Sequence, residues 1–349
     1  MLDLTNFDQN SVGNPNNNVF GLPSSEENAD VIIISAPWEV TVSYGAGTAR
    51  APEAIKKASL QVDLYDPDMP NAWKRGYYLT PVDQKILLKS DFLRREAELY
   101  IDYISKGDDV SKNQFIQKSI KEINEGSIFF NNWIYEQAKD YLSRGKLVGL
   151  LGGDHSTPLG LYKALAEKHK EFGILMVDAH CDLREAYEGF TYSHASIMYN
   201  ALNEIPQIKN LLQVGVRDFG QDEWEYIKNS NYRVITYFDK EIKERQYDGD
   251  TYKHIVEEIV DQLPQKVHIS FDIDGLDPRL CPDTGTPVPG GFEMDRMFYL
   301  FRKVRESGRE IIGFDLVEVG IAETDWNANV GARALFYLCN LLASNPKQQ

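Results

Sequence analysis

The stretch VHISFDIDGLDP, residues 267–278, begins with apolar and β-branched residues and ends in three aspartates, Asp272, Asp274 and Asp277. An apolar run of this length that ends in Asp, Gly or Pro is typical of a buried parallel strand, although periodicity alone does not exclude a short buried helix. Similar runs at 174–177 (ILMV) and 147–151 (LVGLL) precede DAHCD and GGDHS. The repeated pattern predicts a parallel sheet with polar residues at the strand ends.

Each of the three runs ends in side chains that bind metal ions. Asp178, His180 and Asp182 alternate with other residues in DAHCD, and GGDHS supplies His155. In open parallel sheets, ligands gather at the carboxyl ends of the strands. We therefore expect the three clusters to converge on one crevice, and this convergence carries more weight than any single motif.

The charges of these side chains favour two metal ions over one. Four carboxylates in one crevice would repel each other, whereas two divalent cations would balance them. Two imidazoles complete a nitrogen and oxygen ligand set that suits Mn²⁺, Fe²⁺, Co²⁺, Ni²⁺ or Zn²⁺, and its many carboxylates favour Mn²⁺. Ions about 3.5 to 4 Å apart lower the pKa of a shared water, which predicts a hydrolase. The predicted ligands are His155, Asp178, His180, Asp182, Asp272 and Asp274.

Three residues beside these ligands are predicted to have supporting roles. Asp154 could orient the imidazole of His155, and Asp277, which precedes a proline, fits a turn. Cys181 lies between two predicted ligands, but alternation along an extended chain points it away from them, toward packing. With three cysteines in all and no paired spacing, neither a disulfide framework nor a thiolate metal site is predicted.

In this order and at these separations, GGDHS, DAHCD and SFDIDGLDP resemble the motifs of the ureohydrolase superfamily, which includes arginase, agmatinase and formimidoylglutamase. Residues 35–55, 284–291 and 314–319 are also similar to parts of that family, so the resemblance spans nearly the whole chain. It implies a three-layer α/β/α sandwich with a central, mainly parallel sheet. It also implies two Mn²⁺ ions per subunit, with Asp178 and Asp272 bridging them.

The stretch DLREAYEGFTYSHASIM, residues 182–198, is most similar to agmatinases. The resemblance implies that a metal-bridging hydroxide hydrolyses agmatine to putrescine and urea. A second hypothesis is another guanidino or formimino substrate, such as arginine, guanidinobutyrate, formimidoylglutamate or guanidine. A third is a metal-bound, non-catalytic binding or assembly protein, but the complete ligand set counts against it.

The resemblance also implies catalytic and substrate-binding roles. His194 would pass a proton to the leaving amine, and Glu318 would bind the guanidinium group, while Asp274 is both ligand and catalytic residue. On sequence alone, His194 equally fits an exposed loop and Glu318 a surface charge at a strand end. Arg184 stands where arginases carry Asn. It could bind a substrate carboxylate bidentately or form a salt bridge with the protein itself.

The composition of the chain indicates its domain organisation and excludes some classes of partner. The 349 residues are 42% hydrophobic and show no obvious linker, which predicts a single domain over residues 1–349. A net charge of -16 argues against nucleic acid and anionic membranes and is compatible with a small cationic guanidino substrate. The amino terminus is polar and acidic, and no apolar run approaches the roughly 18 residues of a membrane span. We therefore expect a cytoplasmic protein.

Two segments depart from a compact ureohydrolase pattern. Residues 1–30 form a polar amino-terminal segment, and a charged, Tyr-rich insertion occupies about 65–126. We predict a helical hairpin in the insertion, serving as a lid, an oligomer contact or a solvated addition. Its aromatic residues Trp73, Tyr77 and Tyr78 could line an entrance or pack against the body. The family resemblance further implies a homo-oligomer, a trimer or hexamer.

Overall fold

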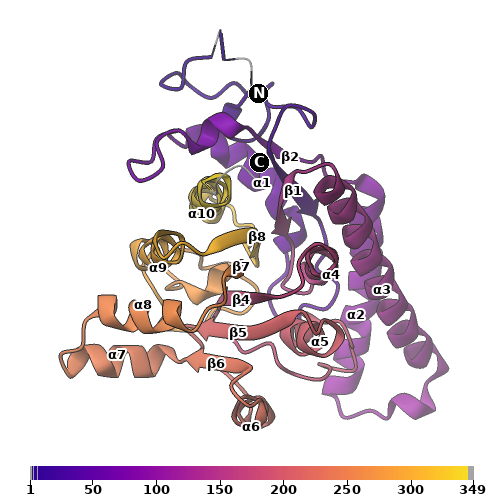
Figure 1. Ribbon diagram of the computed structural model, residues 1–349. Coiled ribbons are helices and arrows are strands. Elements are labelled where there is room, and N and C mark those ends of the chain that lie inside the picture. The colour runs from indigo at the N-terminus through magenta and orange to yellow at the C-terminus, as the bar shows by residue number, and fades with distance from the viewer. Residues whose placement is uncertain (1, 3, 6, 345–349) are drawn as a thin grey trace.

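The computed structural model describes residues 2, 4, 5 and 7–344 and is built around one eight-stranded sheet (Figure 1). All paired strands run parallel, in the order β2-β1-β3-β8-β7-β4-β5-β6. The strands are β1 (Val31–Ala36), β2 (Tyr77–Leu79), β3 (Leu147–Gly152), β4 (Phe172–Val177), β5 (Ile208–Val214), β6 (Val234–Tyr237), β7 (Lys266–Asp272) and β8 (Glu310–Val317).

Helices cover both faces of this sheet. One layer holds α1 (Ala51–Ala58), α7 (Asp239–Tyr247), α8 (Tyr252–Asp261), α9 (Met294–Glu306) and α10 (Trp326–Ala343). The other holds α2 (Gln84–Ser105), α3 (Gln114–Ser143), α4 (Leu159–Lys168), α5 (Ile197–Glu204) and α6 (Gln221–Asn229). Two separate hydrophobic cores fill the spaces between sheet and helices. The predicted three-layer α/β/α sandwich is confirmed.

The central strands are buried on both faces, which explains their sequences. Every residue of β4 is buried, and so is every residue of β7 after its first. A strand covered on both sides reads as a continuous apolar run, with no polar face to alternate with it. The runs at 147–151, 174–177 and 267–271 therefore form β3, β4 and β7, as predicted. These three strands and β8 lie next to one another in the middle of the sheet.

The segment 65–126 contributes the edge strand β2, the helix α2 and the first part of α3. The two helices form a hairpin beside the sheet, with α2 begun by Asp83, whose side chain accepts hydrogen bonds from two backbone nitrogens of the first turn. Trp73 and Tyr77 are buried in a core, and the Tyr77 hydroxyl donates to Asn340 Oδ1 at 2.6 Å. These two aromatic residues therefore pack against the body and do not line an entrance.

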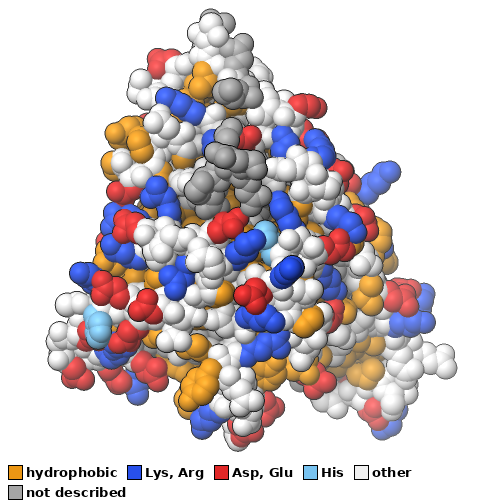
Figure 2. Space-filling view, viewed as in Figure 1, with side chains coloured by type: hydrophobic (Ala, Val, Ile, Leu, Met, Phe, Trp, Pro, Cys, Tyr) orange, Lys and Arg blue, Asp and Glu red, His pale blue; other side chains and the backbone are white. Residues whose placement is uncertain are grey.

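The single-domain organisation remains a prediction, and one sheet that joins both halves of the chain supports it. Within the described residues, none of the helices combines the length and apolar character that crossing a bilayer would require. The surface is mixed in charge: Figure 2 shows acidic and basic side chains interspersed over the visible face.

Candidate metal centre

Four neighbouring strands deliver the predicted ligands and the predicted guanidinium-binding residue Glu318 to one edge of the sheet. Asp272 is the last residue of β7, Asp178 directly follows β4, and Glu318 directly follows β8. His155 lies three residues beyond the end of β3. Because the order of these strands is β3-β8-β7-β4, their carboxyl ends lie side by side and the motifs meet in space.

A glycine allows the sharp turn that brings His155 into the site. A Cβ at Gly153 would lie 1.8 Å from the carbonyl oxygen of Trp38, so a larger residue would force the backbone apart. Asp154 accepts hydrogen bonds from the backbone nitrogen and hydroxyl two residues later, which fixes the turn. The prediction that Asp154 orients the His155 ring is wrong, because the ring nitrogen Nε2 contacts the hydroxyl of Ser270 at 2.9 Å.

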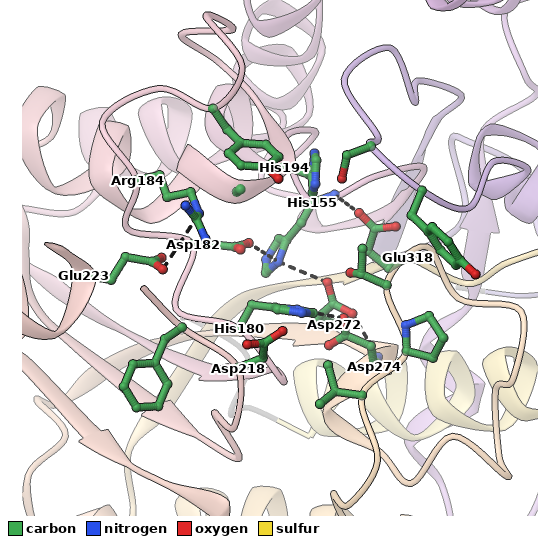
Figure 3. Close-up of a pocket in the computed structure, with 18 residues that line it drawn as sticks. His155, His180, Asp182, Arg184, His194, Asp218, Glu223, Asp272, Asp274 and Glu318 are labelled. Carbon is green, nitrogen blue, oxygen red and sulfur yellow. Dashed lines mark hydrogen bonds and ion pairs between the residues drawn. The ribbon is translucent and has the colours of Figure 1, made fainter. Parts of the chain in front are cut away.

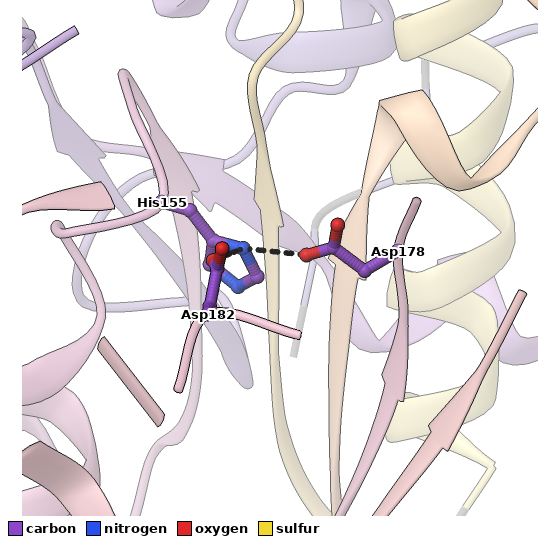
Figure 4. A group of neighbouring side chains, drawn as sticks. All are labelled: His155, Asp178 and Asp182. Carbon is purple, nitrogen blue, oxygen red and sulfur yellow. Dashed lines mark ion pairs between the residues drawn. The ribbon is translucent and has the colours of Figure 1, made fainter. Parts of the chain in front are cut away.

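The first group of candidate ligands surrounds His155. Its Nδ1 atom lies 2.9 Å from Asp178 Oδ2, 3.0 Å from Asp182 Oδ2 and 3.2 Å from Asp272 Oδ2. Figure 4 shows His155, Asp178 and Asp182 pointing toward one another. All four side chains are buried. One nitrogen and three carboxylate oxygens therefore face a common point.

The second group surrounds His180. Its Nδ1 atom lies 3.0 Å from Asp274 Oδ2 and 3.5 Å from Asp178 Oδ1. Asp178 belongs to both groups, because its two oxygens face different histidines. Asp178 Oδ1 also accepts a hydrogen bond from the His180 backbone nitrogen at 2.6 Å, and the bridging role of Asp178 remains a prediction that its place in both groups supports. Asp272 Oδ2 faces the first group, whereas its Oδ1 accepts a hydrogen bond from the Asp274 nitrogen at 2.9 Å, so a bridging role for Asp272 remains a prediction.

Unpaired buried atoms show that these groups fit metal ions. His155 Nδ1, Asp178 Oδ2 and Asp274 Oδ2 are buried without a hydrogen-bond partner in the described structure. Burying such atoms unpaired is costly, and native proteins rarely leave them so. Their lone pairs point into the two clusters, as the lone pairs of metal ligands do. The structure therefore brings together all six predicted ligands in an arrangement suited to two cations.

Without cations, the buried charges shift each other's protonation. Burial raises the pKa of Asp182 to about 7 and raises the pKa of Asp272 well above its ordinary range, with neighbouring carboxylates adding to both shifts. For His155 and His180, burial lowers the pKa, but the facing carboxylates outweigh burial and the net pKa is raised. Protons thus occupy the clusters, and bound metal ions would displace them.

A buried polar network supports the first group from below. Ser270 holds the His155 ring and donates to Asp315 Oδ1 at 2.8 Å. The other oxygen of Asp315 contacts His268 Nε2 at 2.6 Å and accepts from the Tyr162 hydroxyl at 2.9 Å. All five residues are almost fully buried. The network fixes the imidazole so that its free nitrogen faces the carboxylates.

Sequence reasoning missed this network. In β7, His268, Ser270 and Asp272 alternate, so their side chains point to the same face. Ser270 pairs in register with Asp315 of β8. Polar residues repeated every second position in an otherwise apolar strand were the available signal.

The two carboxylate oxygens of Glu318 have different surroundings. Its Oε1 accepts a hydrogen bond from the His155 backbone nitrogen at 2.9 Å, while Oε2 is buried without a partner in the described structure. Burial, and then the charge of Asp154, raises the pKa of Glu318 well above its usual range. A Cβ at Gly285 would lie 2.8 Å from Glu318 Oε2, so the loop 284–291 passes close to the carboxylate. Glu318 is therefore no exposed surface charge.

His194 is also buried, at 9% exposed. Burial, and then the charges of His180 and His155, lowers the pKa of His194 to about 3, which leaves the ring neutral near pH 7. Its Nδ1 atom has no hydrogen-bond partner in the described structure, and its ring stands edge-on to Tyr187 with centroids 6.0 Å apart. A neutral imidazole with a free nitrogen can accept or pass on a proton.

A cavity of about 430 Å³ lies over the ligands (Figure 3). His155, His180, Asp272, Asp274 and Glu318 form its inner end. Its remaining wall comes from loops, from a short 3-10 helix at His194–Ser196 and from the first turn of α6: Ser43, Tyr44, Asp182, Arg184, Tyr187, His194, Ala195, Asp218, Phe219, Glu223, Thr286, Pro287 and Val288. The sequence indicated Asp182, Arg184, His194 and the loop 284–291 but gave no sign of Asp218, Phe219 or Glu223.

Arg184 lies at the wall of this cavity with its side chain 43% exposed. Its guanidinium stacks on the Tyr187 ring at 4.9 Å from the centroid. Its Nε atom lies 3.8 Å from Glu223 Oε2, and Glu223 is itself buried and accepts hydrogen bonds from the backbone nitrogens of Leu183 and Gly220. The predicted salt bridge within the protein is present, in a loose form.

The family model described as "Arginase family" matches residues 29–339. The chain therefore belongs to the arginase family. It is 29% identical to an N(1)-aminopropylagmatine ureohydrolase of Thermus thermophilus over 312 residues, 89% of each chain. It is 28% identical to an agmatinase of Bacillus anthracis over 297 residues, 85% of each chain. The fold matches that of an agmatine ureohydrolase of Thermoplasma volcanium with a TM-score of 0.67 and 21% identity, covering 91% of this chain and 92% of that one.

These matches confirm the predicted superfamily and the prediction of a ureohydrolase enzyme. Arginase-family proteins use a binuclear metal centre, and the two side-chain groups around Asp178 are capable of holding one. These matches identify neither the substrate nor the metal ions.

Proposed function

We propose that this protein hydrolyses agmatine to putrescine and urea with two Mn²⁺ ions. The ions would be held by His155, Asp178, His180, Asp182, Asp272 and Asp274. Two divalent ions at such a site activate water as a nucleophile at neutral pH and stabilise negative charge as it develops. The carboxylate-rich ligand set favours Mn²⁺ over softer ions.

The chain's own residues would position the substrate and move the proton. Glu318 presents its free Oε2 to the inner end of the cavity, where a planar guanidinium cation would pair with it. Adding one water to the guanidinium carbon and breaking its bond to the tail nitrogen yields urea and an amine. That amine needs protons, which the added water gives up; the neutral His194 ring, with its free Nδ1, would take up one of them and pass it to the amine.

The charged residues at the outer end of the cavity favour agmatine as the substrate. Arg184 is the one arginine or lysine that lines the described cavity, and it faces the Glu223 carboxylate. Asp218 lines the same wall. One cation among two carboxylates leaves a net negative wall, which favours a cationic tail such as the ammonium of agmatine over a carboxylate.

Aminopropylagmatine is the second candidate substrate. The Thermus relative is named for this compound, and Tyr44 at the cavity wall is 82% exposed, so a longer cationic tail could extend past it toward solvent. Arginine, guanidinobutyrate, formimidoylglutamate and guanidine fit the net negative wall less well, because they lack a purely cationic tail.

The test is urea release by the Mn²⁺-loaded protein from agmatine, aminopropylagmatine, arginine, 4-guanidinobutyrate and guanidine, with formamide release from formimidoylglutamate in parallel. We expect the highest kcat/KM for agmatine. A higher kcat/KM for aminopropylagmatine would instead identify this longer compound as the substrate. Preference for 4-guanidinobutyrate would contradict the proposed role of the acidic wall.

We also propose that the protein is a homo-oligomer, as the family resemblance implies. Leu88, Phe92 and Leu99 follow one another along the outer side of α2 and are 67%, 56% and 55% exposed, which is costly for a monomer in water. Light scattering coupled to gel filtration would measure the molar mass. A mass equal to that of one chain would contradict the proposal.

A further inference from the structure

The hairpin of α2 and α3 contacts both loops that frame the cavity. We call residues 39–50 the first mouth loop and residues 184–193 the second mouth loop. Ser43 and Tyr44 of the first and Arg184 and Tyr187 of the second line the cavity. No described residue of α2 or α3 lines it. These loops are therefore a route by which the hairpin can affect the site.

Helix α2 holds the first mouth loop from behind. Ser90 accepts a hydrogen bond from the Glu39 backbone nitrogen at 3.1 Å. Arg94 donates from Nη1 to the carbonyl oxygen of Val42, one residue before the part that lines the cavity. The Arg94 side chain is only 12% exposed, so this contact is shielded from water. An interior guanidinium bonded to a loop carbonyl fixes the path of that loop.

Helix α3 holds the second mouth loop. The Asn124 side chain donates to the Gly189 carbonyl at 3.1 Å and accepts from the Thr191 backbone nitrogen at 2.9 Å. The Phe190 ring, between these two residues, packs against Tyr100 of α2 with centroids 5.4 Å apart. The loop is thus attached to both helices of the hairpin.

The ion pair of the Arg94 guanidinium is with Glu98 of the same helix, at 3.1 Å between Nε and Oε1, and its charge also reaches the second mouth loop. Burial raises the pKa of the Glu188 carboxyl, and the nearby Arg94 guanidinium opposes that shift. Glu188 Oε2 is buried without a hydrogen-bond partner in the described structure, and the residue has a positive φ of 54°. The end of the second mouth loop is tied to the first next to the Arg94 contact: the backbone nitrogen of His194, the residue after the loop, donates to the hydroxyl of Thr41 at 3.2 Å, and Thr41 precedes Val42.

We propose that Arg94 is a positioning residue that fixes the two mouth loops relative to each other and so determines how tightly the substrate tail is bound. This inference rests on the proposed guanidino-substrate hydrolysis. Arg94 neither lines the cavity nor contacts a candidate metal ligand. Its removal should therefore act on KM, with little effect on kcat or metal content.

The kinetic test compares Arg94→Met with Arg95→Met. Methionine keeps much of the aliphatic volume but removes the charge and the donors, and Arg95 is the neighbouring residue on the exposed side of the same helix. We expect Arg94→Met to raise the KM for agmatine by about tenfold, with kcat within about threefold, because a loosened wall costs binding more than chemistry. Arg94→Lys should recover part of the KM, since it restores the charge but not the guanidinium contacts to both Val42 and Glu98.

Several kinetic results would overturn the inference. An unchanged KM in Arg94→Met is one, and an equal change in Arg95→Met is another. Loss of bound manganese in Arg94→Met would assign the residue a structural role in the metal centre.

A second measurement does not depend on the substrate. Hydrogen exchange of the manganese-loaded protein without substrate should become faster in both mouth loops for Arg94→Met. It should become faster only in residues 184–193 for Asn124→Ala, which removes the two hydrogen bonds to that loop. If no guanidino compound is turned over but this exchange pattern holds, the proposed function fails and the positioning role stands. Unchanged exchange in the first loop of Arg94→Met would contradict the positioning role even in an active enzyme.

Discussion

The inner and outer ends of the cavity are built in different ways. At the inner end, the side chains follow β3, β4, β7 and β8 closely and contact one another at about hydrogen-bond distances, and all are buried except His180, whose side chain is 24% exposed. At the outer end, the wall comes from loops with exposed residues, such as Tyr44 and Arg184, held from behind by α2 and α3. The inner end is preorganised for a reaction common to a family. The outer end can vary without changing this reaction, so it determines which substrate tail is bound.

This difference predicts where substitutions act. Changes at the strand ends should abolish metal binding or chemistry for every substrate. Changes at the outer wall should leave the metal centre intact and alter the preference among tails.

The largest effect is expected for Asp178→Asn, because Asp178 contributes an oxygen to each ligand group. Both bound manganese and urea release should be lost, with kcat/KM below about one thousandth of its starting value. Asp277→Asn is the matched control, since Asp277 pairs with Arg279 outside the ligand groups. Full urea production by Asp178→Asn without bound metal would defeat the two-ion proposal.

Ser270→Ala tests the support beneath the ligands. Losing the contact to His155 Nε2 should free the imidazole to rotate and weaken manganese affinity by about 10 to 100-fold. Metal titration followed by mass spectrometry would measure the affinity. Ser119→Ala removes another buried serine hydroxyl, one that donates to Glu96 in the hairpin, and should leave the affinity unchanged. Equal affinities in the two variants would mean that the network does not orient His155.

The metal-free protein should lose stability as pH rises. The pKa of Asp182 is raised from 3.8 to about 7 in the folded chain, so its protonated form stabilises the fold below pH 3.8, and this contribution disappears as pH approaches 7. His155 and His180 have raised pKa values, and their contribution is present below 6.5 and is lost at higher pH. We expect the Tm of the chelated protein to fall by about 2 °C or more between pH 5 and 8.

Manganese should remove most of this dependence, because the ions replace the protons in the clusters. Differential scanning calorimetry with and without the metal checks both statements. A Tm of the chelated protein that rises over the same interval would contradict the proposed protonation of the clusters.

The smallest effects are expected at the outer wall. Asp218→Asn should raise the KM for agmatine about fivefold, the loss of roughly 1 kcal/mol expected for a partly exposed ion pair. Arg184→Ala should leave the agmatine KM within about twofold, because Glu223 already faces that guanidinium. If Arg184→Ala instead raises the KM for 4-guanidinobutyrate sharply and Asp218→Asn changes nothing, the tail site binds a carboxylate.

The inner end could be predicted from the sequence because its information is local. Apolar runs ending in DAHCD, GGDHS and SFDIDGLDP predict strands, and parallel strands bring their ends together. The outer end could not be predicted in this way. Asp218 and Glu223 follow β5 without a metal-type motif, and the attachment of Val42 to Arg94 joins residues 52 positions apart through one hydrogen bond.

Local motifs also misplaced one contact at the inner end. Asp154 stands next to His155 in the sequence, yet its carboxylate fixes the turn, while Ser270 holds the ring from a strand 115 residues away. A residue next to a ligand in the sequence often holds the turn that contains both, so its side chain cannot also contact the ligand's ring. Side chains on another strand of the sheet, here β7, can approach the ring from the opposite side.

Bound manganese and urea release from agmatine, measured on the same samples as metal is gradually withdrawn, test the central claim most directly. The account predicts two manganese ions per chain in the fully active protein, and loss of urea release as either ion leaves. Full urea release with one ion or none would contradict a reaction centre built from two ligand groups that share Asp178.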